Sequence, residues 1–126
     1  MLHSLKHRGP DESGYLARDG VALANARLSI IDVADGHQPT HNEDDTIHVV
    51  FNGEIYNQSD LRGELKMRGH RFASRADTEI LAHLYEEEGV DFLQRLNGMF
   101  AIALWDEQKR RLVLARDRLG IKPLFY

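Results

Sequence analysis

A chain of 126 residues is long enough to form one domain that buries roughly two-thirds of its unfolded surface. Its 42% hydrophobic and 29% charged residues are typical of a globular protein, and a net charge of -4 argues against nucleic-acid binding, which needs a basic face. The N-terminus lacks the apolar core of a signal peptide, no apolar run approaches the ~20 residues that span a bilayer, and cysteine is absent. We therefore expect a cytoplasmic domain without disulfides and without a membrane or nucleic-acid partner.

The N-terminal part predicts the end of a helix followed by a hairpin. Leu2 to Lys6 has the apolar spacing of a last helical turn, which Gly9-Pro10 ends. Because Asp19-Gly20 favours a tight two-residue turn, Gly14 to Arg18 and Val21 to Ala26 are predicted to pair as antiparallel strands. A helix without its first turns suggests that the sequence begins inside an element.

The middle of the chain predicts a strand and then a helix. Thr46 to Phe51 is β-branched and apolar, and this strand should deliver Asn52-Gly53-Glu54 at its end. In the helix that follows, Leu61 and Leu65 share one face and Gly69 ends it. Its candidate N-terminal caps are Asn57 and Ser59.

The C-terminal half predicts one more helix and a strand pair. The helix fits Thr78 to Glu88, with a buried stripe of Ile80, Leu81, Leu84 and Tyr85. Met99 to Trp105 is apolar at every position, so both faces of this strand should be covered. Asp106 to Lys109 turns the chain, and Arg111 to Ala115 returns as the partner strand. Helices mixed with strand pairs, without internal repeats or linkers, indicate a single α+β unit.

Four motifs occur in an order that resembles the glutaminase domain of class II glutamine amidotransferases, and most closely that of glutamine-hydrolysing asparagine synthetases. They are RLSIID (residues 27–32), FNGEIYN (51–57), RADTE (75–79) and RDRLGIKPL (116–124). The resemblance covers nearly the whole chain, from about His7 to Tyr126. It implies a four-layer αββα sandwich of the N-terminal-nucleophile hydrolase kind, here lacking its first strand. Residues 1–126 would then be a partial glutaminase domain without the synthetase domain.

The resemblance also implies a glutamine site. Arg27 would grip the substrate carboxylate with paired hydrogen bonds, and Asp77 would hold the substrate ammonium, with Glu54 as a further contact. The side-chain amide of Asn52 and the backbone N–H of Gly53 would form the oxyanion hole. The remaining implied substrate contacts are Leu28, Ser29, Ile30 and Ile31.

Ordinary structural roles exist for the same residues. Asn-Gly is a common turn, and Asn97-Gly98 is interpreted as purely structural. Arg27 alone would suit a surface ion pair, and Asp77 a helix cap. The chain also departs from the usual family pattern, with Asn25-Ala26 before the substrate arginine and Ala76 where serine is common.

The family's nucleophile is missing from this sequence. In the relatives the thiol of an N-terminal cysteine attacks glutamine and the α-amine of the same residue is the base. Here the second residue is Leu2 and the cysteine count is 0. We therefore expect this chain to be inactive by itself. It is either a piece of a glutamine-dependent asparagine synthetase or a free-standing, non-catalytic glutamine sensor or interaction domain.

The expected ligands and partners follow from the resemblance. L-glutamine is the expected ligand, and a synthetase domain in cis or in trans is the expected partner; ATP and Mg²⁺ would belong to that domain, so no cofactor is expected here. A homodimer through an exposed sheet edge is expected where the first strand is lacking. Seven histidines raise the question of a metal, but His3 with His7 and His37 with His41 come without a recognisable third ligand, so we predict none.

Overall fold

The structure, a computed structural model, describes residue 7 and residues 12–27 and 37–125. Two antiparallel sheets, a β1-β2 hairpin and a four-stranded sheet in the order β3-β4-β5-β6, account for its strands. The elements are β1 (Glu12–Arg18), β2 (Val21–Arg27), β3 (Thr40–His41), β4 (Ile47–Ile55), α2 (Gln58–Met67), α3 (Asp77–Glu88), a 3-10 helix (Gly89–Gln94), β5 (Gly98–Asp106) and β6 (Arg111–Arg116). The predicted α+β class is confirmed.

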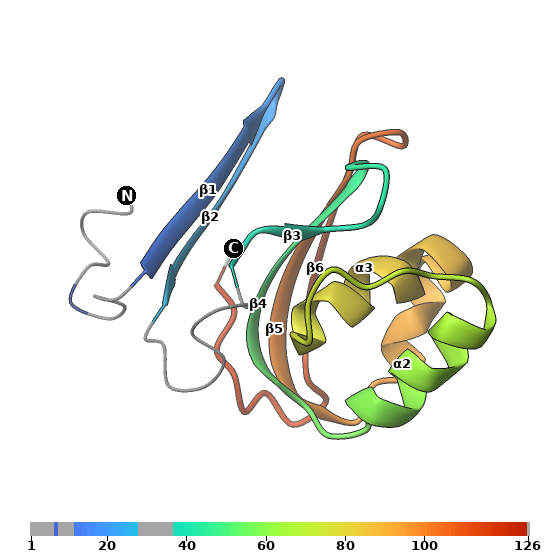
Figure 1. The fold of residues 1–126 in the computed structure, drawn as a ribbon. Helices are drawn as coiled ribbons and strands as arrows, with labels where there is room; N and C mark the ends of the chain where they lie inside the picture. Colours follow the sequence, from blue (N-terminus) through green and yellow to red (C-terminus); the bar gives the residue numbers. More distant parts are fainter. Residues whose placement is uncertain (1–6, 8–11, 28–36, 126) are drawn as a thin grey trace.

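Figure 1 shows these elements as successive layers. The β1-β2 hairpin lies on one side of the four-stranded sheet, and α2 and α3 cover the other side. This order of hairpin, sheet and helices is consistent with the predicted αββα sandwich. The predicted helix end at residues 2–6 lies outside the described residues.

The hairpin forms where the sequence predicts it. Arg18 lies opposite Val21, so Asp19-Gly20 is the two-residue turn, and Gly20 has the positive φ of 85° that such turns require. The pairing continues to Glu12 opposite Arg27. Its strands are therefore slightly longer than the predicted ones.

The predicted strand at Thr46 to Phe51 is too short. β4 continues through Asn52, Gly53 and Glu54 to Ile55, and every residue from Ile47 to Ile55 has a partner in β5. The Asn52-Gly53-Glu54 segment thus belongs to the sheet and does not follow it as a loop. Pairing along β5 overrides the turn preference of Asn-Gly.

The core lies between the four-stranded sheet and the helices. All eight residues of α3 from Thr78 to Tyr85 are buried, so this helix is covered on more than the predicted stripe. α2 instead buries one face through Leu61 and Leu65, as predicted. α3 therefore lies inside the molecule and α2 at its surface.

β5 is one of the two inner strands of the sheet, but its two faces are not equally covered. Phe100, Ile102 and Leu104 are buried on the helix side, whereas residues 99, 101 and 103 on the other side are only half-buried. On that other side Trp105 is buried, so the prediction that both faces are covered is confirmed for the helix side and only in part for the other. The strand ends at the buried Asp106, which accepts a 2.9 Å hydrogen bond from the hydroxyl of Tyr85.

Asn57 stands at the N-terminal cap of α2 without a side-chain capping bond, so the predicted capping interaction is wrong. Its side chain instead accepts the Asn97 N–H (3.0 Å) and donates to the Arg95 carbonyl (3.0 Å). Ser59, the other candidate, lies inside the helix. Gly69 follows the C-terminal end with φ of 103°, as predicted for a helix stop.

The last motif folds around one carboxylate. Buried Asp117 accepts backbone N–H bonds from Phe100, Leu119, Ile121 and Lys122 at 2.9–3.2 Å. The hydrogen bond from Lys122 is the largest cause that lowers the pKa of Asp117 to about 2. A single charged side chain thus ties residues 117–122 to β5.

We predict that Asp117→Asn lowers the melting temperature by several degrees at neutral pH, because the amide offers one acceptor oxygen in place of two. The folded-state pKa is below the unfolded one, so the carboxylate's contribution is present at neutral pH and is lost between about pH 4 and pH 2. The difference between wild type and variant should therefore shrink across that range in circular-dichroism melts. Asp91→Asn, at an exposed position of the 3-10 helix, is the control. A constant difference across the pH range would contradict the prediction.

Candidate functional site

The candidate oxyanion residues lie near the end of β4. The side chains of Val49, Phe51 and Ile55 enter the core on the helix side. Since side chains alternate along a strand, Asn52 and Glu54 project from the opposite face, where both are exposed. Within the described ranges the Asn52 amide makes no hydrogen bond, so its N–H groups are available to a ligand.

The edge of β4 away from β5 is lined by side chains where β3 no longer pairs with it. The Phe51 N–H donates to Gln38 Oε1 at 2.8 Å, and the Ile55 N–H donates to Asp77 Oδ2 at 3.4 Å. Backbone groups of alternate residues point to the same edge. The N–H of Gly53 is therefore directed to this edge, between Gln38 and Asp77.

Asp77 is the first residue of α3, and this places its carboxylate beside β4. Burial raises the pKa of Asp77, and the negative charge of nearby Glu54 raises it further, against the lowering effect of backbone hydrogen bonds. The negative charges of Asp77 and Glu54 are thus close enough to interact. Two neighbouring carboxylates favour a nearby cationic group, such as an ammonium.

Gln38 is the residue that sequence reasoning missed. Its Oε1 accepts both the Asn25 Nδ2–H (2.7 Å) and the Phe51 N–H (2.8 Å), and its Nε2–H donates to the Thr78 hydroxyl at 3.4 Å. One amide therefore joins β2, β4 and α3. Asn25, noted above as a departure from the family pattern, holds Gln38 in place. The residues around Gln38 in the sequence form no motif that would have indicated this role.

The loop before Asp77 is shaped by a buried glutamate and an arginine. Glu79 accepts N–H bonds from Ala73 (2.6 Å) and Ser74 (2.8 Å), and the Ser74 hydroxyl (2.6 Å). Arg62 donates to the carbonyls of Ser74 (2.9 Å) and Ala76 (2.7 Å). These bonds satisfy backbone groups of Ala73, Ser74 and Ala76 and fix the start of α3.

The structure describes only some of the predicted substrate-site residues. Arg27 ends β2, opposite Glu12, but the position of its side chain lies outside the described residues. Leu28, Ser29, Ile30 and Ile31 also lie outside them. Of the predicted residues, the structure brings together Asn52, Gly53, Glu54 and Asp77.

The two Asn-Gly pairs are structurally alike. A Cβ at Gly53 would lie 2.0 Å from the Met99 carbonyl oxygen, and one at Gly98 would lie 2.2 Å from the Glu54 carbonyl oxygen. Both glycines are therefore required by close contact between β4 and β5. The predicted structural role of Gly98 is confirmed, and Gly53 has the same structural role besides its candidate one.

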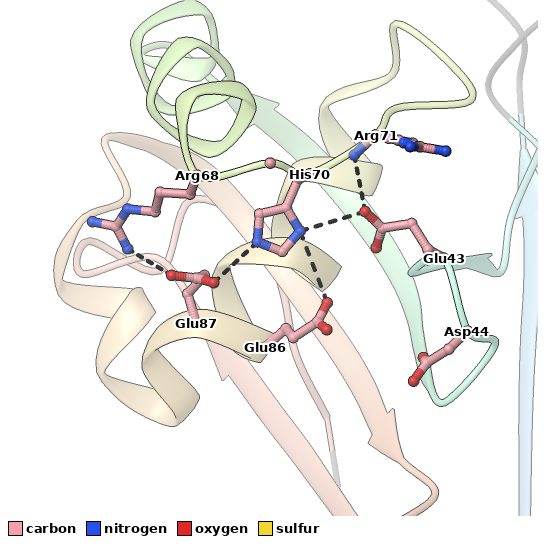
Figure 2. Close-up of a pocket in the computed structure, with 8 residues that line it drawn as sticks. Glu43, Asp44, Arg68, His70, Arg71, Glu86 and Glu87 are labelled. Atoms are coloured by element: carbon pink, nitrogen blue, oxygen red, sulfur yellow. Dashed lines mark hydrogen bonds and ion pairs between the residues drawn. The ribbon is translucent and has the colours of Figure 1, made fainter.

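One group of side chains has the composition of a metal site. One ligand atom each from Glu43, His70, His83 and Glu86 lies within 4.8 Å of the others. The group adjoins an open pocket of about 460 Å³ (Figure 2). Burial lowers the pKa of His83 and thereby favours the neutral imidazole that binds metals. These are not the histidine pairs considered in the sequence.

Comparison with solved structures defines the class of fold. The glutamine phosphoribosylpyrophosphate amidotransferase of B. subtilis, complexed with ADP and GMP, superposes with a TM-score of 0.72 at 24% identity, over 97% of this chain and 34% of that one. A structure described as the allosteric regulatory enzyme of purine biosynthesis gives 0.67 at 23% identity, over 81% of this chain and 24% of that one. The fold is that of the N-terminal-nucleophile amidotransferases.

Sequence comparison defines the family. A model of the glutamine amidotransferase domain matches residues 1–126, and the chain belongs to that family. Asparagine synthetase [glutamine-hydrolyzing] 2 of Bacillus subtilis is 47% identical over 126 residues, which are 100% of this chain and 17% of that protein. Asparagine synthetase [glutamine-hydrolyzing] of Sandersonia aurantiaca is 50% identical over 125 residues, 99% of this chain and 23% of that protein. The chain thus spans about a fifth of these relatives.

None of the helices in the described part of the chain is long and apolar enough to cross a membrane.

We predict that Gly53→Ala destabilises the protein by roughly 2–4 kcal/mol, because the added methyl group meets the Met99 carbonyl. Gly63 is the matched control, since a Cβ there meets nothing within 4 Å on α2. Gly63→Ala should stabilise by about 0.5–1 kcal/mol through helix propensity. Urea denaturation measures both. Equal stability of Gly53→Ala and wild type would show that β4 and β5 can separate at this point.

Proposed function

We propose that this chain is the glutamine-binding portion of the glutaminase domain of a glutamine-hydrolysing asparagine synthetase. The observation that carries the proposal is the edge of β4, where the Gly53 N–H points between Gln38 and Asp77 and the free Asn52 amide lies beside it. The family match over residues 1–126 supports glutamine as the ligand. The relatives' names support asparagine synthesis as the use of the ammonia.

In this proposal the residues divide between holding glutamine and stabilising the reaction. Asp77 and Glu54 attract the substrate ammonium, and Arg27 receives the α-carboxylate. The side-chain amide would then extend toward Asn52 and Gly53, whose N–H groups stabilise the oxyanion. Loss of one oxyanion donor costs about 2.7–4 kcal/mol of transition-state stabilisation in a well-studied hydrolase. Leu28 to Ile31 would complete the wall of the pocket.

The rest of the reaction belongs to parts that these 126 residues do not hold. The chain has no cysteine, so it supplies neither the thiol nor the paired α-amine. A synthetase domain, in cis or in trans, would use ATP and Mg²⁺ to activate the acceptor. The cytoplasm is the proposed compartment, because reduced thiols persist there.

A second candidate is a non-catalytic glutamine sensor. Such a domain needs the substrate-holding groups without the nucleophile. Asn25 and Ala76, at positions where the family differs, would then reflect relaxed demands on the pocket. Both candidates share glutamine binding and differ in turnover.

We predict that glutamine binding falls at least tenfold in Asp77→Asn, because a charge-assisted hydrogen bond contributes about 1.5–3 kcal/mol. Calorimetric titration of glutamine measures this. Asp60→Asn, which removes an equal charge from the first turn of α2, is the matched control. Unchanged affinity in both Asp77→Asn and Arg27→Ala would overturn the site assignment.

The stability of Asp77→Asn separates lost binding from lost folding. The pKa of Asp77 is raised in the folded state, so ionisation disfavours folding at neutral pH and this cost disappears below that pKa. We therefore predict that Asp77→Asn melts no lower than wild type near neutral pH. Any increase in the melting temperature of Asp77→Asn over that of wild type should disappear as the pH drops through the Asp77 pKa.

We predict that the chain releases no glutamate from glutamine until a cysteine-initiated strand is fused ahead of Leu2. Loss of a nucleophile lowers kcat by about 10⁶ in a serine protease. Coupled glutamate assay of the chain and the fusion, with a Cys→Ala control, tests this. A folded fusion that binds glutamine without turnover would favour the sensor.

The proposed homodimer would use a sheet edge. Within the described sheet β6 pairs only with β5, and its Leu112 and Leu114 are exposed at 46% and 43%. Unpaired edges of this kind attract another strand. Light scattering of the chain and the fusion would show whether the added strand makes it more monomeric.

A further inference from the structure

A group of glutamate and histidine side chains lies near the end of β4 that is remote from Asn52. Glu43 lies on the β3-β4 connection, His70 on the α2-α3 connection, and His83 and Glu86 on α3. Along α3, Glu86 lies nine residues after Asp77 of the glutamine site, roughly 14 Å at helix rise. The group thus belongs to a different part of the molecule and has no role in the proposed function.

The ligand atoms have the spacing of a shared ion. His83 Nδ1 lies 3.1 Å from Glu43 Oε2, and His70 Nδ1 lies 3.5 Å from Glu43 Oε1 and 4.0 Å from Glu86 Oε2. Tetrahedral zinc with bonds of about 2.0–2.2 Å places its ligands roughly 3.3–3.6 Å apart. Of these separations, 3.5 Å lies within that range, 3.1 Å is slightly shorter and 4.0 Å is longer; all ligand atoms of the group lie within 4.8 Å of one another, so side-chain adjustment would bring them to an ion.

Both imidazoles turn the same nitrogen toward the group. His70 Nδ1 faces Glu43 and Glu86, while its Nε2 lies 3.2 Å from Glu87, which Arg68 holds at 2.9 Å (Figure 2). His83 Nδ1 faces Glu43, while its Nε2 lies 3.8 Å from Glu79. At His70 the hydrogen-bonded Glu87 carboxylate favours the tautomer whose Nδ1 lone pair is free for a metal.

His83 supplies the independent observation that points to a ligand. Its side chain is only 1% exposed, and neither of its ring nitrogens has a hydrogen-bond partner among the described residues. The 3.1 Å contact with Glu43 is close, yet the oxygen lies off the direction that a hydrogen bond requires. A nitrogen and a carboxylate oxygen that lie close together without forming a hydrogen bond are placed as two ligands of one ion would be. A buried polar atom without a partner otherwise costs about 1–3 kcal/mol.

We propose that Glu43, His70, His83 and Glu86 form a structural zinc site. Two imidazole nitrogens and two carboxylate oxygens suit Zn²⁺ and do not suit Mg²⁺ or Ca²⁺, which prefer oxygen ligands throughout. The ion would join the β3-β4 connection, the α2-α3 connection and α3, which are far apart in sequence. Open solvent in the adjoining pocket gives it a path of entry.

A simple network of ion pairs is the alternative, and metal titration distinguishes it. The whole chain, freed of metal with a chelator, is titrated with Zn²⁺ and then with Co²⁺. The proposal expects one saturable site, the strong visible absorption of tetrahedral Co²⁺, and a melting temperature about 5–10 °C higher at a hundredfold excess over Kd. Mg²⁺ and Ca²⁺ should not compete.

Matched variants locate the site. Glu43→Gln should weaken Zn²⁺ binding at least tenfold, whereas Asp44→Asn, the neighbouring acid on the same pocket wall, should leave it unchanged. Both side chains are exposed, so neither change threatens the fold. Glu86→Gln and Glu88→Gln form a second pair, since Glu88 pairs with Arg95 outside the group.

Histidine variants exclude adventitious binding. His70→Ala should abolish the Co²⁺ spectrum, while His41→Ala, at an exposed position on β3, should retain it. Circular dichroism checks that each variant is folded. If His70→Ala is unfolded, Zn²⁺ binding by Glu43→Gln and Glu86→Gln tests the proposal in its place. Absence of saturable Zn²⁺ binding, or equal binding by wild type, Glu43→Gln and Glu86→Gln, would overturn the proposal.

Discussion

The pairing of β4 with β5 is the contact on which the candidate site depends. Gly53 and Gly98 allow the two backbones to approach closer than any side chain would permit, and every residue from Ile47 to Ile55 has a partner. This pairing sets which side chains of β4 enter the core and which face away from it. It also directs alternate N–H groups to the edge that Gln38 and Asp77 line.

The buried helix α3 carries side chains that matter at both of its ends. Asp77 at its start contacts the edge of β4, and Glu86 near its finish faces His70. Because Thr78 to Tyr85 are buried on all sides, the helix has little freedom to turn or shift. Packing of this buried segment therefore fixes the positions of the polar regions at both ends of α3.

Short-range patterns predicted much of this fold. The turn at Asp19-Gly20 and the strand β5 can each be predicted from a few neighbouring residues. Partners distant in sequence were not predictable in this way: Gln38 meets Asn25 and Thr78, and Asn57 meets the 95–97 turn instead of capping its helix. Family motifs supplied the candidate site residues, and the structure brings together those of β4 and α3. The metal-ligating group escaped notice because its histidines are thirteen positions apart and lie on different elements.

The candidate oxyanion donor at Gly53 is a backbone N–H and not a side-chain group, so its position depends on the strand and not on the residue type. Only proline removes a backbone donor; with any other residue the donor moves only if the strand slides against its neighbour. A slip of one residue would exchange the two faces of β4, placing Asn52 in the apolar interior and Phe51 in water. Burial of the apolar side chains of β4 therefore keeps this strand in register with β5. Hydrophobic residues far from any ligand thus determine where the hydrogen-bond donors of the site point.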